Sequence, residues 1–136
     1  MIPQPMDTSP APVTASSRDR NWAMGVHVGA MVMAVLTSWA AGLAGVLVAG
    51  VVYFLRRDNS PFVAEHARTA LNFNASMFLY SLIAAALVFL TLGLALIVVI
   101  PVGLILFGVW VVASIMAAGA AMEGRPYRYP LALSLF

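Results

Sequence analysis

Two histidines and one line of polar side chains are the residues of this sequence that could do chemistry. His27 and His66 are imidazoles that titrate near neutral pH, and both lie in or beside long apolar stretches. The polar line recurs every three to four residues, which places its members within about an 80° arc of one helix. In hydrocarbon such a face must turn toward other helices or a wet cavity. Its members are Glu65, Thr69, Asn72, Ser76 and Tyr80.

These residue types allow three roles. The polar line together with His27 could form a proton or ion path, the two histidines could bind a metal, or the same groups could hydrogen-bond one another inside the protein. His27 and His66 have no clear third ligand, which makes a metal site incomplete. Hydrogen bonding is the favoured interpretation, and we expect no metal and no cofactor.

The side chains do not form a recognisable catalytic arrangement. Glu65, His66 and Arg68 lie within one helical turn, a spacing typical of a local ion pair between Glu65 and Arg68. The serines show no nucleophile elbow, and the sequence contains no cysteine for a disulfide, a thiol nucleophile or a thiolate ligand. We therefore expect no enzyme activity.

Two uncharged stretches, residues 21–55 and 69–122, must position these groups, and they predict a membrane protein. Hydrophobic residues make up 62% of the sequence and charged residues 9%, against about 25% charged residues in soluble domains. A spanning helix needs about 20 apolar residues, so each stretch can form a hairpin, although the helices of the first would be short. The basic residues lie at the borders of these stretches and form no patch that could track phosphates. Nucleic acid is not an expected partner.

The arginines predict four spans with both termini in the cytoplasm. Basic residues collect in cytoplasmic loops, and only two hairpins place all three arginine groups on one side. The uncharged turns near residues 37–42 and 92–101 then face the other side. The alternative, one tilted helix through the first stretch, divides the arginines between the two sides. The topology-determining residues are Arg18, Arg20, Arg56, Arg57, Arg68, Arg125 and Arg128.

The predicted fold is all-α, an integral membrane four-helix bundle with a short interfacial amphipathic segment before the third span. The spans are expected at about residues 22–37, 40–55, 70–92 and 100–122. Residues 1–17, rich in proline and serine, are expected to form a disordered cytoplasmic tail before a membrane domain over residues 18–136. Asn59 or Ser60 can cap the third helix, and His27 shares a helix face with three alanines. The apolar ending is expected to be ordered and to fold back onto the membrane surface.

Three segments resemble a family of bacterial four-span membrane proteins. They are RNWAMGVHVG, SPFVAEHARTALNFNASMFLY and YRYPLALSLF. The resemblance is to a domain family of unknown function related to the Tic-twenty component, a subunit of the chloroplast inner-envelope protein-import translocon. It implies a similar four-helix architecture in the bacterial inner membrane and no established activity. The motif positions are Trp22, Phe62, Glu65, His66, Asn72, Phe73, Tyr129 and Pro130.

Two classes of function remain open. The favoured class is a non-catalytic membrane module that packs with itself or with a larger membrane complex. The other is a pore or translocation component that uses the polar line as its path; four short helices enclose little volume, so such a pore would need several copies or a partner subunit. Membrane lipids, and a second copy or a complex subunit, are the expected partners.

Overall fold

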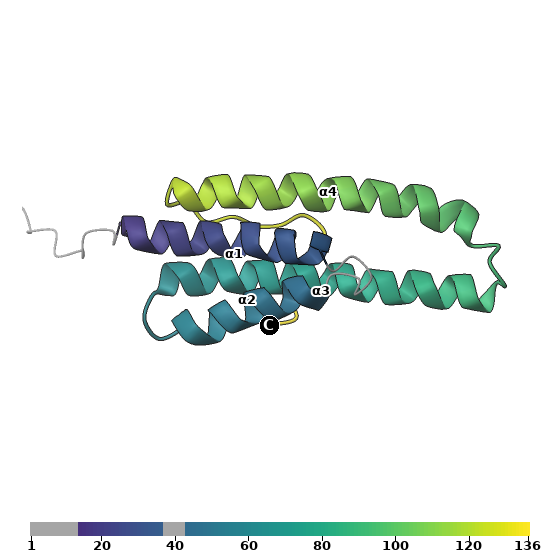
Figure 1. Cartoon of the computed structure of the whole chain (residues 1–136), viewed down its shortest axis with the longest axis horizontal. Coiled ribbons are helices and arrows are strands. Elements are labelled where there is room, and N and C mark those ends of the chain that lie inside the picture. The colour runs from purple at the N-terminus through teal and green to yellow at the C-terminus, as the bar shows by residue number, and fades with distance from the viewer. Residues whose placement is uncertain (1–13, 37–42) are drawn as a thin grey trace, which may run out of the picture.

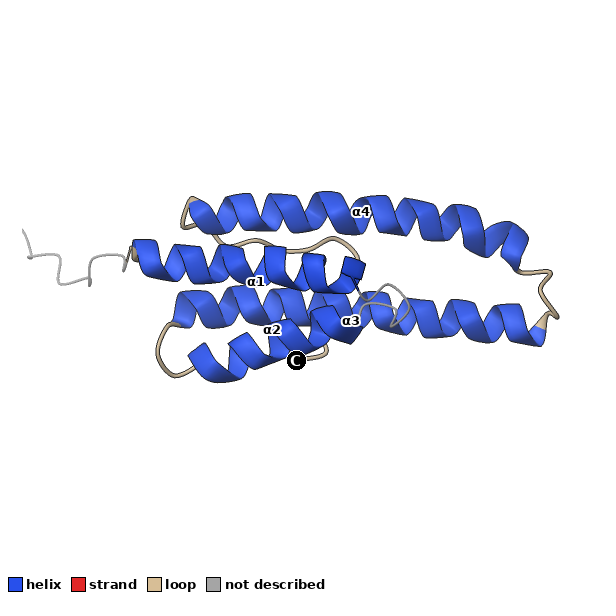
Figure 2. Ribbon diagram, viewed as in Figure 1, coloured by secondary structure: helices blue, strands red, loops and turns tan. Residues whose placement is uncertain are grey.

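The structure is a computed structural model, and it describes residues 14–36 and 43–136. Over these residues it contains four helices and no strand (Figures 1 and 2). The tail expected over residues 1–17 falls outside the described part at positions 1–13, as does the turn expected at 37–42. The helices are α1 (Ser17–Leu36), α2 (Leu43–Arg56), α3 (Pro61–Leu90) and α4 (Leu96–Met122).

The helices differ in length. At 1.5 Å per residue, α3 and α4 are about 45 Å and 40 Å long, α1 about 30 Å and α2 about 21 Å. Of the described helices, α3 and α4 are long and apolar enough to cross a membrane, whereas α2 is apolar but shorter. Figure 1 shows the consequence: the α3–α4 hairpin extends well beyond α1 and α2.

Helix α3 begins where the sequence predicts a cap. The Ser60 hydroxyl accepts a hydrogen bond from the Val63 amide at 3.4 Å, and Pro61 occupies the first turn, where it removes no helical hydrogen bond. Residues 61–69, expected as an interfacial segment at the start of the third helix, are the first turns of this continuous helix. Val63 and Ala67 are buried there, and Ala67 packs in one cluster with Val26 of α1.

Helix α1 is the centre of the packing. It contacts all three other helices, and α2 packs along α3, whereas α3 and α4 hardly touch each other. The predicted alanine face of α1 is confirmed, since Ala23, Ala30 and Ala34 are buried together with His27. Small residues matter most at Gly45 of α2, where an added methyl group would overlap the Asn74 side chain of α3 and lie 3.2 Å from the Ala30 carbonyl. Three helices therefore meet at Gly45.

Burial divides the α3–α4 hairpin into two halves. In the packed half, residues 61–76 and 110–122, fifteen residues are buried, eight in α3 and seven in α4. In the open half, residues 77–109, no residue is buried. The open half exposes large apolar side chains such as Phe89 and Ile97.

A slot separates the two helices in the open half. It has a volume of about 740 Å³ and is lined along its length by side chains of α3 and α4, with Ala34 and Val35 of α1 at its inner end. At the outer end, the chain reverses through Leu92 and Gly93, both with positive φ. The Thr91 hydroxyl accepts a hydrogen bond from the Ala95 amide at 3.0 Å, which ties this turn together.

Candidate functional site

The two histidines and Tyr129 form one buried hydrogen-bonded chain. His27 Nε2 lies 2.8 Å from His66 Nδ1, and His27 Nδ1 lies 2.8 Å from the Tyr129 hydroxyl. His66 Nε2 lies 3.1 Å from the carbonyl oxygen of Arg125. His27 and His66 are each 1% exposed and Tyr129 is 8% exposed, so these bonds form away from water. We call these three residues the His–His–Tyr chain.

Its hydrogen bonds can run in only one direction while both imidazoles are neutral. The Arg125 carbonyl can only accept, so His66 must carry its proton on Nε2 and accept at Nδ1. His27 then donates from Nε2 to His66 and accepts at Nδ1 from the Tyr129 hydroxyl. Every polar atom of the two rings is thereby satisfied by the protein itself.

This geometry differs from that of a metal site. A metal ion needs three or more donor atoms that converge on one point. His66 binds one ring nitrogen of His27, Nε2, and the Tyr129 oxygen binds the other, Nδ1. The three side chains therefore form a line and do not converge on one point. No group of three or more His, Cys, Asp or Glu side chains that could hold a metal occurs among the described residues.

The secondary structure explains how the three rings meet. His27 lies on the alanine face of α1, and the cap at Ser60 places His66 in the second turn of α3. Helix α4 ends at Met122, and Gly124 follows its cap with a φ of 73°, which suits a glycine. The Arg125 amide closes the end by donating to the Ala120 carbonyl at 2.9 Å. The chain then turns back into the bundle and carries Tyr129 to His27.

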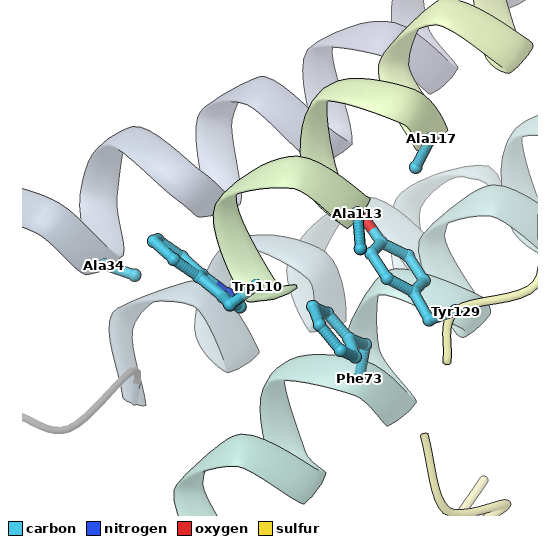
Figure 3. Packing of buried hydrophobic residues seen from close by; sticks show 6 residues of the cluster. All are labelled: Ala34, Phe73, Trp110, Ala113, Ala117 and Tyr129. Carbon is cyan, nitrogen blue, oxygen red and sulfur yellow. The ribbon is translucent and has the colours of Figure 1, made fainter. Parts of the chain in front are cut away.

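Tyr129 is fixed by packing as well as by hydrogen bonding. Its ring stacks on Phe73 of α3, with centroids 4.0 Å apart and planes inclined by 16°. Figure 3 shows this stack beneath α4, with Tyr129 beside Ala113 and with Ala117 one turn further along. Burial raises the pKa of the Tyr129 hydroxyl above its ordinary value of 10, although the Ser114 hydroxyl opposes part of this rise. Tyr129 therefore remains a neutral donor.

The polar line of α3 is occupied by the end of the chain. Residues 130–136, which we call the C-terminal strap, lie along α3 and offer backbone groups to it (Figure 1). The Tyr80 hydroxyl donates to the Leu131 carbonyl at 2.9 Å, and the Ser76 hydroxyl accepts from the Leu133 amide at 2.8 Å. Asn72 Oδ1 accepts from the amides of residues 135 and 136 at 3.0 Å and 2.8 Å.

The other two members of the polar line take no part in this contact. The Thr69 hydroxyl donates to the His66 carbonyl at 3.0 Å within α3, and Glu65 is exposed. The expected ion pair between Glu65 and Arg68 is absent: the ion pairs of the described residues join Arg57 to Asp58 and Arg125 to Glu123. His27 also does not reach the polar line, because it faces His66 and Tyr129 instead.

Residues 18–136, nearly the whole described chain, match a known protein family. It is the MamF/MmsF family, described as a magnetosome magnetite crystal formation protein family. The chain belongs to the MamF/MmsF family. No curated protein and no solved structure matches it.

This membership corrects the resemblance drawn from the sequence. A family related to the Tic-twenty component was the wrong choice, because the match over residues 18–136 is to MamF/MmsF. The motif positions nevertheless have clear places in this MamF/MmsF protein. Phe62 packs against His66 with ring centroids 4.6 Å apart, and the Arg56 guanidinium lies 4.0 Å from the ring centroid of Trp22. Pro130 follows Tyr129 and is exposed.

The arginine-bearing segments of this MamF/MmsF protein gather at one end. Figure 1 shows the start of α1, the α2–α3 connection and the end of α4 side by side. The Arg56–Trp22 contact joins the first two segments, and the His66–Arg125 hydrogen bond joins the start of α3 to the end of α4. The α3–α4 turn lies at the opposite end and carries no charged residue.

Sequence reasoning missed two residues of the core. Asn74 donates to the Ala70 carbonyl at 2.9 Å, and its oxygen accepts from Trp110 Nε1 at 3.4 Å. Asn74 lies two residues beyond Asn72 and therefore on a different face of α3, outside the polar line. A buried amide opposite an indole is recognisable once α3 and α4 are known to be antiparallel, but no spacing in the sequence pairs residues 74 and 110.

Proposed function

We propose that this protein is a non-catalytic, helix-packing module of a bacterial magnetosome membrane, where it acts in magnetite crystal formation as a homo-oligomer or as a subunit of a membrane complex. The observation that carries the proposal is that the polar side chains of the site form hydrogen bonds within the protein. The His–His–Tyr chain and the contacts of the strap are such bonds, while the open half presents apolar side chains to its surroundings.

The proposed topology has four spans and cytoplasmic termini. It is supported by the clustering of the arginine-bearing segments at one end of the bundle and by the uncharged turn at the other. The short helix α2 can be accommodated by local thinning of the bilayer or by contacts with a neighbouring subunit. Reporter fusions test this directly: fusions at residues 40 and 96 should be extracytoplasmic, and fusions at residue 62 and at residue 136 cytoplasmic. A cytoplasmic signal at residue 40 would contradict four spans.

A path for ions or polypeptides along the polar line is less well supported. Its three inner members, Asn72, Ser76 and Tyr80, already bind the backbone of the strap. We expect the purified protein to be silent in planar bilayers. Reproducible currents that Asn72→Leu abolishes would favour the pore instead.

The role in crystal formation is tested in the host bacterium. Deleting the gene should change the size or number of magnetite crystals, and the wild-type gene should restore them. Glu65→Gln should restore them equally, because Glu65 is exposed and has no catalytic task in this proposal. His27→Leu should fail, since it breaks the His–His–Tyr chain. Unchanged crystals after deletion would refute the proposal, and failure of a normally abundant Glu65→Gln protein would indicate catalysis.

A further inference from the structure

The C-terminal strap buries few of its apolar side chains. Four of its seven residues are leucine or phenylalanine, and each of these four side chains is 39% exposed or more. Within the strap, Ala132 is the residue that packs against the buried cluster of Phe73 and Trp110. Leaving its place on α3 therefore costs the strap little apolar burial.

The strap is held instead by hydrogen bonds to its backbone. Asn72, Ser76 and Tyr80, which we call the α3 ladder, are spaced four residues apart, about 6 Å along a helix. They bind the strap at residues 135, 133 and 131, which are two residues apart, about 7 Å when the chain is extended. These similar spacings let the ladder bind backbone groups at alternate residues. The strap of a second copy would offer the same groups at the same spacing.

The connection into the strap reverses the direction of the chain. After α4 the chain advances along α3, from the contact of Arg125 with His66 to the contact of Leu131 with Tyr80. The strap then returns along α3 and ends at Asn72. Because Tyr129 is fixed at His27, this reversal is confined to the residues that directly follow Tyr129.

The reversal strains the backbone at Leu131. Its φ is 61°, in the left-handed region, where the Cβ atom crowds the following carbonyl oxygen. A bulky side chain seldom adopts this conformation. A chain that continued past Pro130 with an ordinary negative φ would lose the strain, and it would carry the strap away from its own α3.

We propose that two copies of this protein exchange their straps, so that residues 131–136 of each copy bind the α3 ladder of the other. Exchange keeps the hydrogen bonds of both straps and relieves the strain at both copies of Leu131, while each Tyr129 stays at its own His27. It also places the exposed leucines of each strap between two copies of α3. This inference rests on the homo-oligomer of the proposed function, and it specifies that oligomer as a two-fold dimer joined through α3.

Disulfide trapping tests the exchange, because the sequence contains no cysteine. Ser76→Cys and Leu133→Cys place thiols on two residues that a 2.8 Å hydrogen bond joins. One full-length chain carries Ser76→Cys and a second chain, with a different tag, carries Leu133→Cys; the two are co-expressed in one bacterial membrane. Oxidation with diamide should link the two tags, since exchange brings these thiols together only between chains.

Ser81→Cys paired with Leu133→Cys is the matched control. Ser81 lies five residues beyond Ser76 and on another face of α3, where its hydroxyl binds Met77. The Ser76→Cys pair should give at least about tenfold more linked heterodimer than this control. A single chain that carries both Ser76→Cys and Leu133→Cys should likewise form disulfides between chains.

Two substitutions at Leu131 test the strain without cysteines. Leu131→Gly should weaken dimerisation, because glycine adopts a φ of 61° without strain and the unexchanged form gains. Leu131→Pro should strengthen it, because proline fixes φ near −65° and prevents the reversal. Each variant should change the dimerisation constant by at least about tenfold, in opposite directions. Analytical ultracentrifugation in mild detergent measures the constants.

Several results would overturn strap exchange. They are a monomeric wild type, disulfides confined to single chains, a linked heterodimer no more abundant than in the Ser81→Cys control, and Leu131 variants that leave the dimer unchanged or shift it in the same direction. None of these results bears on crystal formation or on the four spans, which gene deletion and reporter fusions test separately.

Discussion

The packed half and the open half of the α3–α4 hairpin are built from the same kind of helix but differ in what surrounds them. Around the packed half, Ala34 of α1 and Tyr129 share a buried cluster with Phe73 and Trp110, and His27 of α1 hydrogen-bonds His66. Around the open half, no other described helix continues alongside, and Phe89 is 81% exposed. The comparison indicates that the fold is stabilised at the arginine end, whereas the open half depends on its apolar surroundings.

Truncating one phenylalanine in each half gives the largest expected contrast. Phe73→Ala should lower the free energy of unfolding by about 3–5 kcal/mol, because it leaves a cavity beside the stacked Tyr129 ring. Phe89→Ala should change it by no more than about 0.5 kcal/mol, since that side chain has little to lose within the protein. Reversible unfolding in the same detergent measures both. Equal losses would erase the distinction between the halves.

A pair of glycine substitutions sharpens the comparison in the helices that surround the packed half, α1 and α2. Gly45→Ala should destabilise the protein by about 1–3 kcal/mol, because the new methyl group overlaps Asn74 where three helices meet. Gly25→Ala on α1 should be neutral or stabilising by about 0.5 kcal/mol, since an added Cβ has open space and alanine favours helix. Melting temperatures of the two variants provide the test, and a tolerant Gly45→Ala protein would show that the helices approach less closely.

Tyr129→Phe is expected to have an effect on stability that shrinks at high pH in a defined way. Removing the hydroxyl leaves the His27 Nδ1 atom without its donor and should cost about 1–3 kcal/mol at neutral pH. In the wild type the folded-state pKa of Tyr129 is raised, so the folded protein holds this proton more tightly than the unfolded chain. Stability should then fall above about pH 10, by up to about 1.4 kcal/mol per pH unit.

The variant should show a shallower decline above that pH, because Tyr129 no longer contributes to it. Burial also raises the pKa of Tyr127, which leaves a residual slope in both proteins. Unfolding free energies at several pH values between neutral and strongly alkaline conditions provide the measurement. Parallel curves for the two proteins would mean that Tyr129 is not buried as described.

Local patterns in the sequence predicted much of the fold. The cap at Ser60 and the alanine face of α1 depend on neighbours within one or two turns, and the structure confirms both. The partners of the site could not be predicted in this way. His27 and Tyr129 are 102 residues apart, and His66 binds a backbone carbonyl 59 residues away, which leaves no trace in side-chain spacing.

The strap and the slot show the same limit. The apolar ending was expected to fold back onto the membrane surface, and the structure shows it folded back onto α3, where its backbone pairs with Ser76 and Asn72. Helix α4 is apolar on all sides, so its sequence cannot tell a face that meets protein from a face that meets lipid. The face of α4 that meets protein is the one beside α1, and it extends only as far as α1 does.

The central claim is that a directed hydrogen-bonded chain of His27, His66 and Tyr129 holds the packed half together. Nitrogen-15 NMR of histidine-labelled protein in lipid bilayers tests it most directly, because it reports the protonation of each ring nitrogen. We predict that both imidazoles are neutral and protonated at Nε2, with scalar coupling between His27 Nε2 and His66 Nδ1 across their hydrogen bond. Two uncoupled imidazoles, or a His66 protonated at Nδ1, would contradict the account.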